Sequence, residues 1–270
     1  MHIDDILSAV QQQLANGADK ATIQVDKSWS QGRTLFGGIS AAVTYQAIAI
    51  KVGEGRLLRS LSTSFVGPIS AEQPLSIEVE ILRQGKNVTQ VLAKAMQDDA
   101  VCITALASFG VERSSKIKVD NLQFHDHQLP KRANFIPQIP KLVPKFLRHF
   151  DMAIVEGKMP FMANDASAIF GWMRFSKAPK QITDAHIIAL IDSWPPPVLQ
   201  MLRWPAPASS LSWNLEFIHP HRDIAATDWF AYQVKTRQAA DGYGHTEANI
   251  WDAKGELIAI SRQVFTVFDS

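Results

Sequence analysis

The part of the sequence best suited to chemistry is the glycine pair Gly37–Gly38, which directly precedes an apolar segment over residues 39–50. Paired glycines let a ligand approach the main chain closely. The apolar segment is typical of a buried helix, and the first N–H groups of a helix have no acceptor within it. These groups can face an anion or the negative charge that develops on a carbonyl oxygen. The alternative is that the glycines form only a tight turn.

Other reactive residue types stand in surroundings that argue against further chemistry. The single cysteine, Cys102, lies in an apolar run, which predicts an inert core residue. The sequence has no Gly-x-Ser-x-Gly elbow, phosphate loop or dinucleotide fingerprint. Two histidine pairs, His125 with His127 and His219 with His221, lack further ligands at the spacing of a zinc site. We therefore expect no metal and no cofactor.

The composition is that of an ordinary globular protein, because 46% of the 270 residues are hydrophobic, 20% are charged, and the formal net charge is +1. This length suits one large domain or two modest ones, and the balanced charge argues against nucleic acid as a partner. No apolar run reaches the ~20 residues that span a bilayer. The single cysteine and an acidic start, Asp4–Asp5, in place of a signal peptide predict a reducing, cytoplasmic location.

The elements that must position the glycine pair follow from the hydrophobic pattern of the first half. An amphipathic helix is predicted over Asp4–Ala15 and a strand over Thr22–Asp26, before the buried helix. Alternating residues then predict four strands in hairpin order: Leu57–Val66, Pro74–Arg83, Val88–Gln97 and Val101–Phe109. Residues 112–150 mix lysine, histidine and proline, which indicates an exposed linker, although a nucleic-acid patch is the alternative.

The same inventory repeats in the second half. An apolar helical stretch begins at Asp184 and continues through Trp194, with its end left open as far as Leu202. The predicted strands are Asp151–Glu156, Ala168–Phe175, Ser210–Ile218, Thr227–Gln238, Gly244–Trp251 and Leu257–Phe268. A repeat of this size means two similar units side by side. We expect an α+β fold with two long buried helices, each wrapped by an antiparallel sheet, in an N-terminal unit (1–111), a linker (112–150) and a C-terminal unit (151–270) that pair edge to edge.

The residues from about Thr22 to the C-terminus resemble the acyl-CoA thioesterase II family, whose members are tandem hotdog proteins. The matching pieces of the first half are Leu35–Gly38, Leu61–Phe65 before Pro68, and Leu82–Lys86. Those of the second half are Asp192, Ser210–Trp213 leading to Phe217 and Pro220, Ala240–Gly242, and Trp251–Asp252 through Gly255–Leu257 to Gln263. The resemblance implies a double hotdog fold.

The resemblance also implies an enzyme that hydrolyses fatty acyl-CoA with a water molecule, without a metal or a covalent intermediate. By resemblance, the family's catalytic Asp, Thr and Gln fall on Asp192, Ser210 and Gln263, so that Ser210 departs from the usual Thr but keeps the hydroxyl. The expected substrate-binding residues are Phe36, Gly37, Gly38 and Trp194. Pro195–Pro197, which follow Trp194, are a second departure, because they can end the helix early. The resemblance further implies a homo-oligomer.

Two other functions stay open at this stage. A non-catalytic acyl-CoA-binding protein on the same fold would follow if the departures at Ser210 and Pro195–Pro197 had removed the activity. A hotdog hydratase or dehydratase would need a His–Asp pair near the helix, and His186 with Asp192 is the candidate pair.

Overall fold

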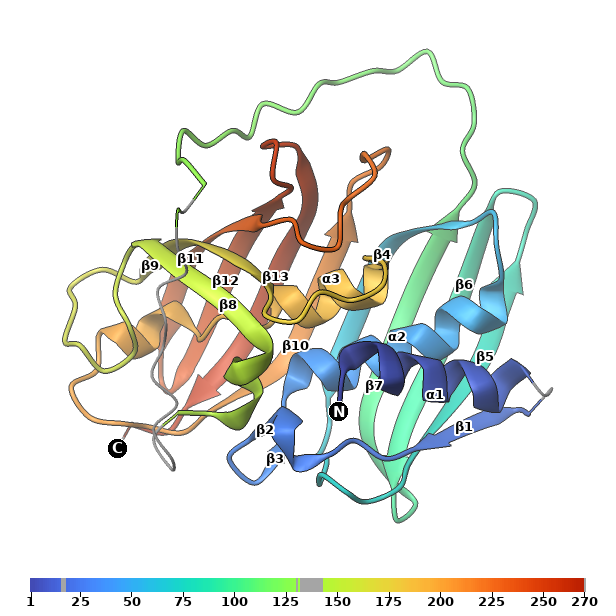
Figure 1. Cartoon of the computed structure of the whole chain (residues 1–270), viewed down its shortest axis with the longest axis horizontal. Coiled ribbons are helices and arrows are strands. Elements are labelled where there is room, and N and C mark those ends of the chain that lie inside the picture. Colours follow the sequence, from blue (N-terminus) through green and yellow to red (C-terminus); the bar gives the residue numbers. More distant parts are fainter. Residues whose placement is uncertain (16–17, 130, 132–142, 270) are drawn as a thin grey trace.

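The computed structural model describes residues 1–15, 18–129, 131 and 143–269, which form one 11-stranded antiparallel sheet, a two-stranded hairpin and three α-helices (Figure 1). The elements of the first half are α1 (Ile3–Ala15), β1 (Lys20–Ile23), η1 (Lys27–Trp29), β2 (Ser30–Gln31), β3 (Thr34–Leu35), α2 (Gly37–Val52), β4 (Leu57–Phe65), β5 (Leu75–Gln84), β6 (Val88–Gln97) and β7 (Ala100–Gly110). Those of the second half are η2 (Lys145–His149), β8 (Phe150–Glu156), β9 (Ala168–Phe175), α3 (Asp184–Ile191), η3 (Pro197–Gln200), β10 (Ala208–Phe217), β11 (Phe230–Ala240), β12 (Tyr243–Trp251) and β13 (Leu257–Val267).

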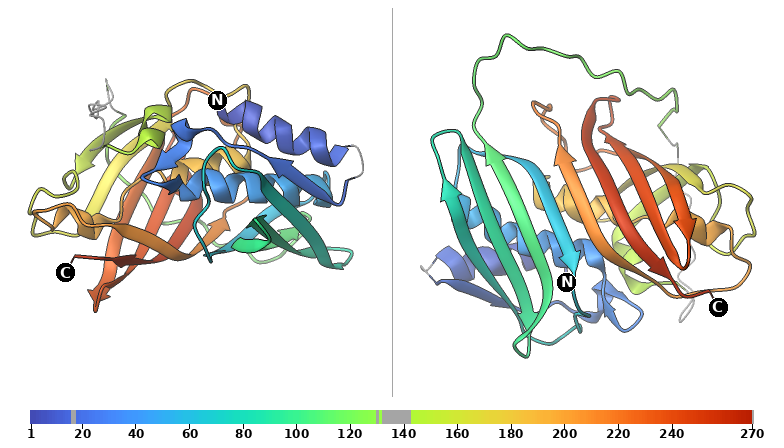
Figure 2. Two further views of the ribbon diagram at one scale, coloured as in Figure 1. Left: turned by 90° about the horizontal axis from the view of Figure 1, so that it is seen from below. Right: turned by 180° about the vertical axis from the view of Figure 1, so that it is seen from behind.

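The predicted α+β class is confirmed, with the α-helices on one side of the sheet (Figures 1 and 2). Helix α2 is buried almost all round, as expected for a helix that is apolar on every face, and α1 packs beside it. The strands present alternate residues to this helix layer, so that Leu75 and Ile77 of β5 are buried while Glu78 of the same strand is exposed. The core therefore lies between the helices and the sheet.

The two halves join where β4 pairs with β10, from Ser60 opposite Glu216 to Ser64 opposite Ser212. At this joint the Ser62 hydroxyl donates to Asn214 Oδ1 at 2.6 Å. The strand order runs β1-β5-β6-β7-β4 through one half and β10-β13-β12-β11-β9-β8 through the other. This is the edge-to-edge pairing that the sequence repeat predicts, and it makes one continuous sheet from two edges.

The expectation of two long helices is wrong for the second half. Helix α3 has only 8 residues, against 16 in α2, and it ends before Asp192. The reason lies in Pro195–Pro197, which lack backbone N–H donors and disfavour helical angles in the residue before each proline. The chain continues instead into the 3-10 helix η3. The first predicted strand is also displaced, because the Asp26 carboxylate accepts from the Ser28 N–H and caps η1.

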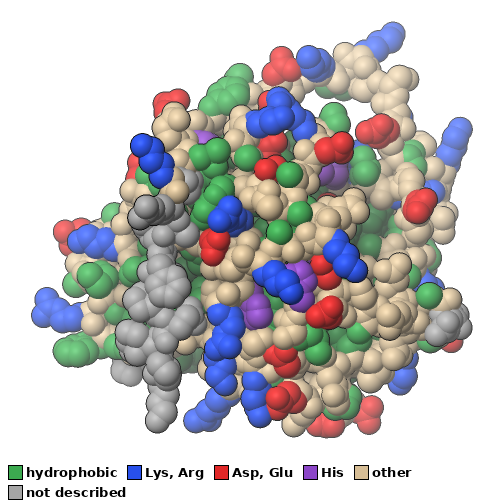
Figure 3. Space-filling view, in the orientation of Figure 1, with side chains coloured by type: hydrophobic (Ala, Val, Ile, Leu, Met, Phe, Trp, Pro, Cys, Tyr) green, Lys and Arg blue, Asp and Glu red, His purple; other side chains and the backbone are tan. Residues whose placement is uncertain are grey.

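The segment after β7, residues 111–129, forms no helix or strand and passes along the outside of the molecule toward the C-terminal half (Figure 1). Residues 130 and 132–142 of the predicted linker lie outside the described residues. Part of the segment contacts the second half, since Trp251 Nε1 donates to the Gln123 carbonyl at 2.8 Å and the His127 ring lies 3.9 Å from that of Phe170. Both signs of charge occur across the face shown in Figure 3. None of the helices within the described part of the chain combines the length and apolar character needed to cross a membrane.

Candidate active site

The first wall of the site is the start of α2, where the glycine pair follows Phe36. The Phe36 side chain is 1% exposed, its ring stacks on Phe146 at 4.0 Å, and its N–H donates to the Trp29 carbonyl. A Cβ on Gly38 would come within 2.4 Å of the Phe36 ring and 3.0 Å of the Ala189 carbonyl of α3. Glycine at this position therefore lets α2 and α3 pack closely.

The second wall is the end of α3, where Asp192 takes the C-cap position with φ −79° and ψ 0°. Its carboxylate points across the boundary between the two halves toward the start of α2. The Gly38 N–H donates to this carboxylate, and a Cβ on Gly37 would lie 2.8 Å from Asp192 Oδ2. The glycine pair thus leaves the space that the carboxylate of the other half occupies.

Two neighbouring strands of the C-terminal half complete the site with Ser210 of β10 and Gln263 of β13. Gln263 Nε2 donates to Ser210 Oγ at 2.7 Å and to Asp192 Oδ1 at 3.1 Å. The β10–β13 register shifts between Ser210 and Ser212, which marks a β-bulge at this point. The structure therefore brings together Asp192, Ser210 and Gln263, which are far apart in the sequence.

Burial sets the protonation behaviour of the site. It raises the pKa of the Asp192 carboxyl from 3.8 to about 7, although the hydrogen bonds from Gln263 and the Gly38 N–H act in the opposite direction. A carboxyl with this pKa exchanges a proton near neutral pH, as a general base must. Burial and the nearby charge of Asp192 also raise the pKa of the Tyr232 hydroxyl on β11, so that Tyr232 stays neutral.

The two large side chains expected to bind substrate lie in the core behind the site. Trp194 is 6% exposed, stacks on the Tyr232 ring at 5.6 Å, and donates from Nε1 to Met173 Sδ. Phe36 is packed against Phe146 as described above, so the side chains of both residues are buried in the core. Sequence reasoning missed Tyr232, because alternation along β11 marks it only as one of several buried positions.

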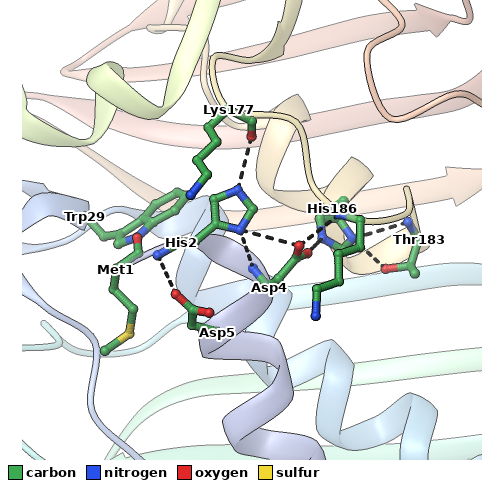
Figure 4. Close-up of polar contacts among 9 residues, drawn as sticks. Met1, His2, Asp4, Asp5, Trp29, Lys177, Thr183 and His186 are labelled. Carbon is green, nitrogen blue, oxygen red and sulfur yellow. Dashed lines mark hydrogen bonds and ion pairs between the residues drawn. The ribbon is translucent and has the colours of Figure 1, made fainter.

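The candidate His–Asp pair of a hydratase does not form. His186 Nε2 lies 3.0 Å from Asp4 Oδ1, and its Nδ1 lies 2.8 Å from the Thr183 hydroxyl (Figure 4). Both ring nitrogens are therefore engaged with residues other than Asp192. His186 belongs to the capping box at the start of α3, and this structural role accounts for the polar residue in an apolar helix.

Comparisons with known proteins identify the family of the chain. The family model of the acyl-CoA thioesterase N-terminal domain matches residues 25–110, and that of the acyl-CoA thioesterase C-terminal domain matches residues 125–267. The chain is 24% identical over 254 residues to acyl-CoA thioesterase 2 of Haemophilus influenzae, covering 86% of each protein.

Solved structures show the same fold at low sequence identity. A hot dog protein of unknown function from Alicyclobacillus acidocaldarius superposes with a TM-score of 0.80 at 21% identity, covering 94% of each chain. An acyl-CoA thioesterase II from Mycobacterium marinum superposes with a TM-score of 0.71 at 21% identity, covering 99% of this chain and 97% of that one. The chain therefore has a hotdog fold.

Proposed function

This chain belongs to the acyl-CoA thioesterase family, and we propose that it hydrolyses the thioester of fatty acyl-CoA to free acid and CoA by direct attack of water. The observation that carries the proposal is the contact of Gln263 Nε2 with both Asp192 Oδ1 and Ser210 Oγ. A carboxylate beside two neutral hydrogen-bonding groups is suited to hold and deprotonate one water molecule.

In the proposed reaction, Asp192 is the general base and Ser210 and Gln263 orient the water. The water oxygen forms a bond to the thioester carbon while its proton passes to Asp192 Oδ. The C–S bond then breaks, and the departing thiolate takes up that proton, which returns Asp192 to its charged form. Neither Ser210 nor Gln263 can accept a proton near neutral pH, so the base must be the carboxylate whose pKa is about 7.

We assign the carbonyl oxygen of the substrate to the N–H groups of Gly37 and Gly38 at the start of α2. The Gly38 N–H donates to the charged Asp192 carboxylate in the resting site. When Asp192 accepts the proton, its charge disappears at the moment when negative charge develops on the substrate oxygen. The same donor can then stabilise that oxygen, and losing such a donor costs ~3–4 kcal/mol in well-studied enzymes.

The remaining parts of the proposal concern the surroundings of the reaction. Phe36 and Trp194 form the apolar wall beneath the acyl group. A homo-oligomer and a cytoplasmic location complete the proposal, the latter because Cys102 is a single buried thiol, which suits a reducing compartment.

The direct test is release of CoA from short, medium and long acyl-CoA by the wild type and by Asp192→Asn. We expect the variant to lose about 10²–10⁴-fold in kcat, because Asn cannot accept the proton. The matched control is Asp252→Asn, another buried aspartate of the same half, which caps a turn by accepting from the Lys254 and Glu256 N–H groups. Binding of acyl-CoA without release of CoA by the wild type would favour a non-catalytic acyl-CoA-binding protein instead.

A further inference from the structure

The two halves correspond residue by residue around the joint. Strand β4 has a register shift after Leu58, seven residues before its last residue, Phe65. Strand β10 has the same shift after Ser210, again seven residues before its last residue, Phe217. With the strand ends aligned in this way, Leu61 of β4 is equivalent to Trp213 of β10. Ala107 of β7 pairs with Leu61, and Gln263 of β13 pairs with Trp213. The equivalents of Ser210 and Gln263 in the N-terminal half are therefore Leu58 and Ala107, which offer no polar side chain.

The helices continue this correspondence. Tyr45 stands as far from the first residue of α2, Gly37, as Asp192 stands from the first residue of α3, Asp184. In the candidate active site Asp192 faces Gly37. At the equivalent place the Tyr45 hydroxyl donates to Asp184 Oδ2 at 3.0 Å. The Tyr45–Asp184 hydrogen bond is thus the counterpart of the candidate active site, without equivalents of Ser210 and Gln263 to orient a water molecule.

We propose that Tyr45 and Asp184 are a positioning pair, which fixes the start of α3 to α2 and thereby holds Asp192 against the glycine pair at the other end of α3. This inference rests on the proposed function. Because α3 is a single short helix of 8 residues, about 12 Å long, displacement of its first turn is transmitted to Asp192. A displacement of ~1 Å in a catalytic group can cost about 10²-fold in rate.

Burial makes loss of the Tyr45–Asp184 hydrogen bond costly. Tyr45 is 5% exposed, its ring stacks on Phe109, and burial together with Asp184 raises the pKa of its hydroxyl. Burial also raises the pKa of Asp184, against the hydrogen bond from Tyr45 and the nearby His219 and His221. A buried polar group that loses its partner keeps the full cost of desolvation. The first turn of α3 is also held by α1, through the contact of His186 with Asp4 (Figure 4).

The experiment compares two disruptive variants with two controls. Tyr45→Phe and Asp184→Ala each remove the hydrogen bond, whereas Asp184→Asn keeps an oxygen that accepts from the Tyr45 hydroxyl. Gln97→Leu is the second control, because it removes the buried hydrogen bonds of Gln97 to Ser70 and Gln73 within the N-terminal half only. The measurements are kcat, KM, the thermal midpoint, and the pKa of Asp192 by carboxyl carbon NMR.

We expect Tyr45→Phe and Asp184→Ala to lower kcat about 10- to 100-fold with a smaller change in KM. In both variants the Asp192 pKa should fall toward its ordinary value, because a displaced carboxyl gains solvent. Tyr232 is the other titratable group that faces Asp192, and its hydroxyl stays neutral throughout. Asp184→Asn and Gln97→Leu should keep the wild-type kcat and the wild-type Asp192 pKa.

Wild-type kcat and an unchanged Asp192 pKa in Tyr45→Phe and Asp184→Ala would overturn the positioning role. The same loss in Gln97→Leu would overturn it too, because the effect would then follow general stability. The NMR titration does not need turnover, so it tests the pair even if the wild type releases no CoA. Failure of the pair and failure of the proposed function are therefore distinguishable.

Discussion

At the scale of the residue, the molecule places a carboxyl where its charged form is disfavoured. Burial of Asp192 between the two halves raises its pKa to about 7, and only part of that effect is offset by Gln263 and the Gly38 N–H. Groups with shifted pKa values concentrate at functional sites because proton transfer near neutral pH requires them. The same burial affects stability, because the charged form of Asp192 is less favourable in the folded protein than in the unfolded chain.

We predict that Asp192→Asn stabilises the protein at alkaline pH relative to the wild type. The folded pKa of Asp192 lies above the unfolded value of 3.8. Its charge therefore costs stability progressively as the pH rises from the unfolded value to about 7, and the cost is complete above that. Asn carries no such charge, so the difference should change by ~4 kcal/mol in its favour between about pH 4 and about pH 8. Urea unfolding at both pH values measures this, and a pH-independent difference would contradict it.

At the scale of the element, the proposed activity depends on how the start of α2 meets the end of α3. Both glycines of the pair lie at this contact, but a methyl group would meet different neighbours at each. At Gly38 it would strike the buried Phe36 ring and the backbone of α3, whereas at Gly37 it would strike the end of the Asp192 side chain and approach the Phe65 ring to 3.3 Å. A side-chain end can move, whereas a buried ring and a backbone carbonyl have little freedom.

We predict that Gly37→Ala and Gly38→Ala separate activity from stability. Gly37→Ala should fold with a wild-type thermal midpoint or a higher one, since alanine favours a helix, but lose about 10-fold or more in kcat because Asp192 is pushed aside. Gly38→Ala should lose ~1–3 kcal/mol of stability through overpacking. Thermal unfolding and CoA release measure both effects, and full activity in Gly37→Ala would place Asp192 outside the reaction.

The elements also show what sequence could predict. Alternation gave the bounds of Val88–Gln97 as the structure has them, because alternate residues of this strand face the core. The bounds of Ala168–Phe175 are also as predicted, although this strand is buried along most of its length on both faces. The end of α3 was predicted too late, because the apolar run through Trp194 favours a helix until the prolines that follow stop it. The meeting of Gln263 with Ser210 depends on strand register, which the hydrophobic pattern alone does not specify, so the expectation came from the resemblance. The contact of Asp184 with Tyr45 left no signal in the sequence.

At the scale of the whole molecule, the candidate site takes residues from both halves. Strand β4 pairs with β10, and α2 packs on α3, so the halves share a sheet and a helix layer. The segment that leaves β7 carries the exposed residues Arg113, Lys116 and Lys118 and has no regular structure.

We predict that trypsin cleaves first after these three residues and that the nicked protein keeps its activity. The two fragments should elute together on gel filtration, because the sheet and the helices hold them, and kcat should stay within about twofold of the intact protein. Separation of the fragments, or loss of turnover on cleavage, would show that the segment itself holds the site together.

The central claim is that Asp192 activates water for hydrolysis of acyl-CoA. The most direct test is kcat/KM for release of CoA from acyl-CoA, measured for the wild type and Asp192→Asn between about pH 5 and about pH 9. The account predicts that the wild-type value rises through one ionisation near the Asp192 pKa of about 7, and that the variant shows neither this ionisation nor appreciable turnover. A wild-type profile that is flat across this range, or a variant that keeps the same rising profile, would contradict it.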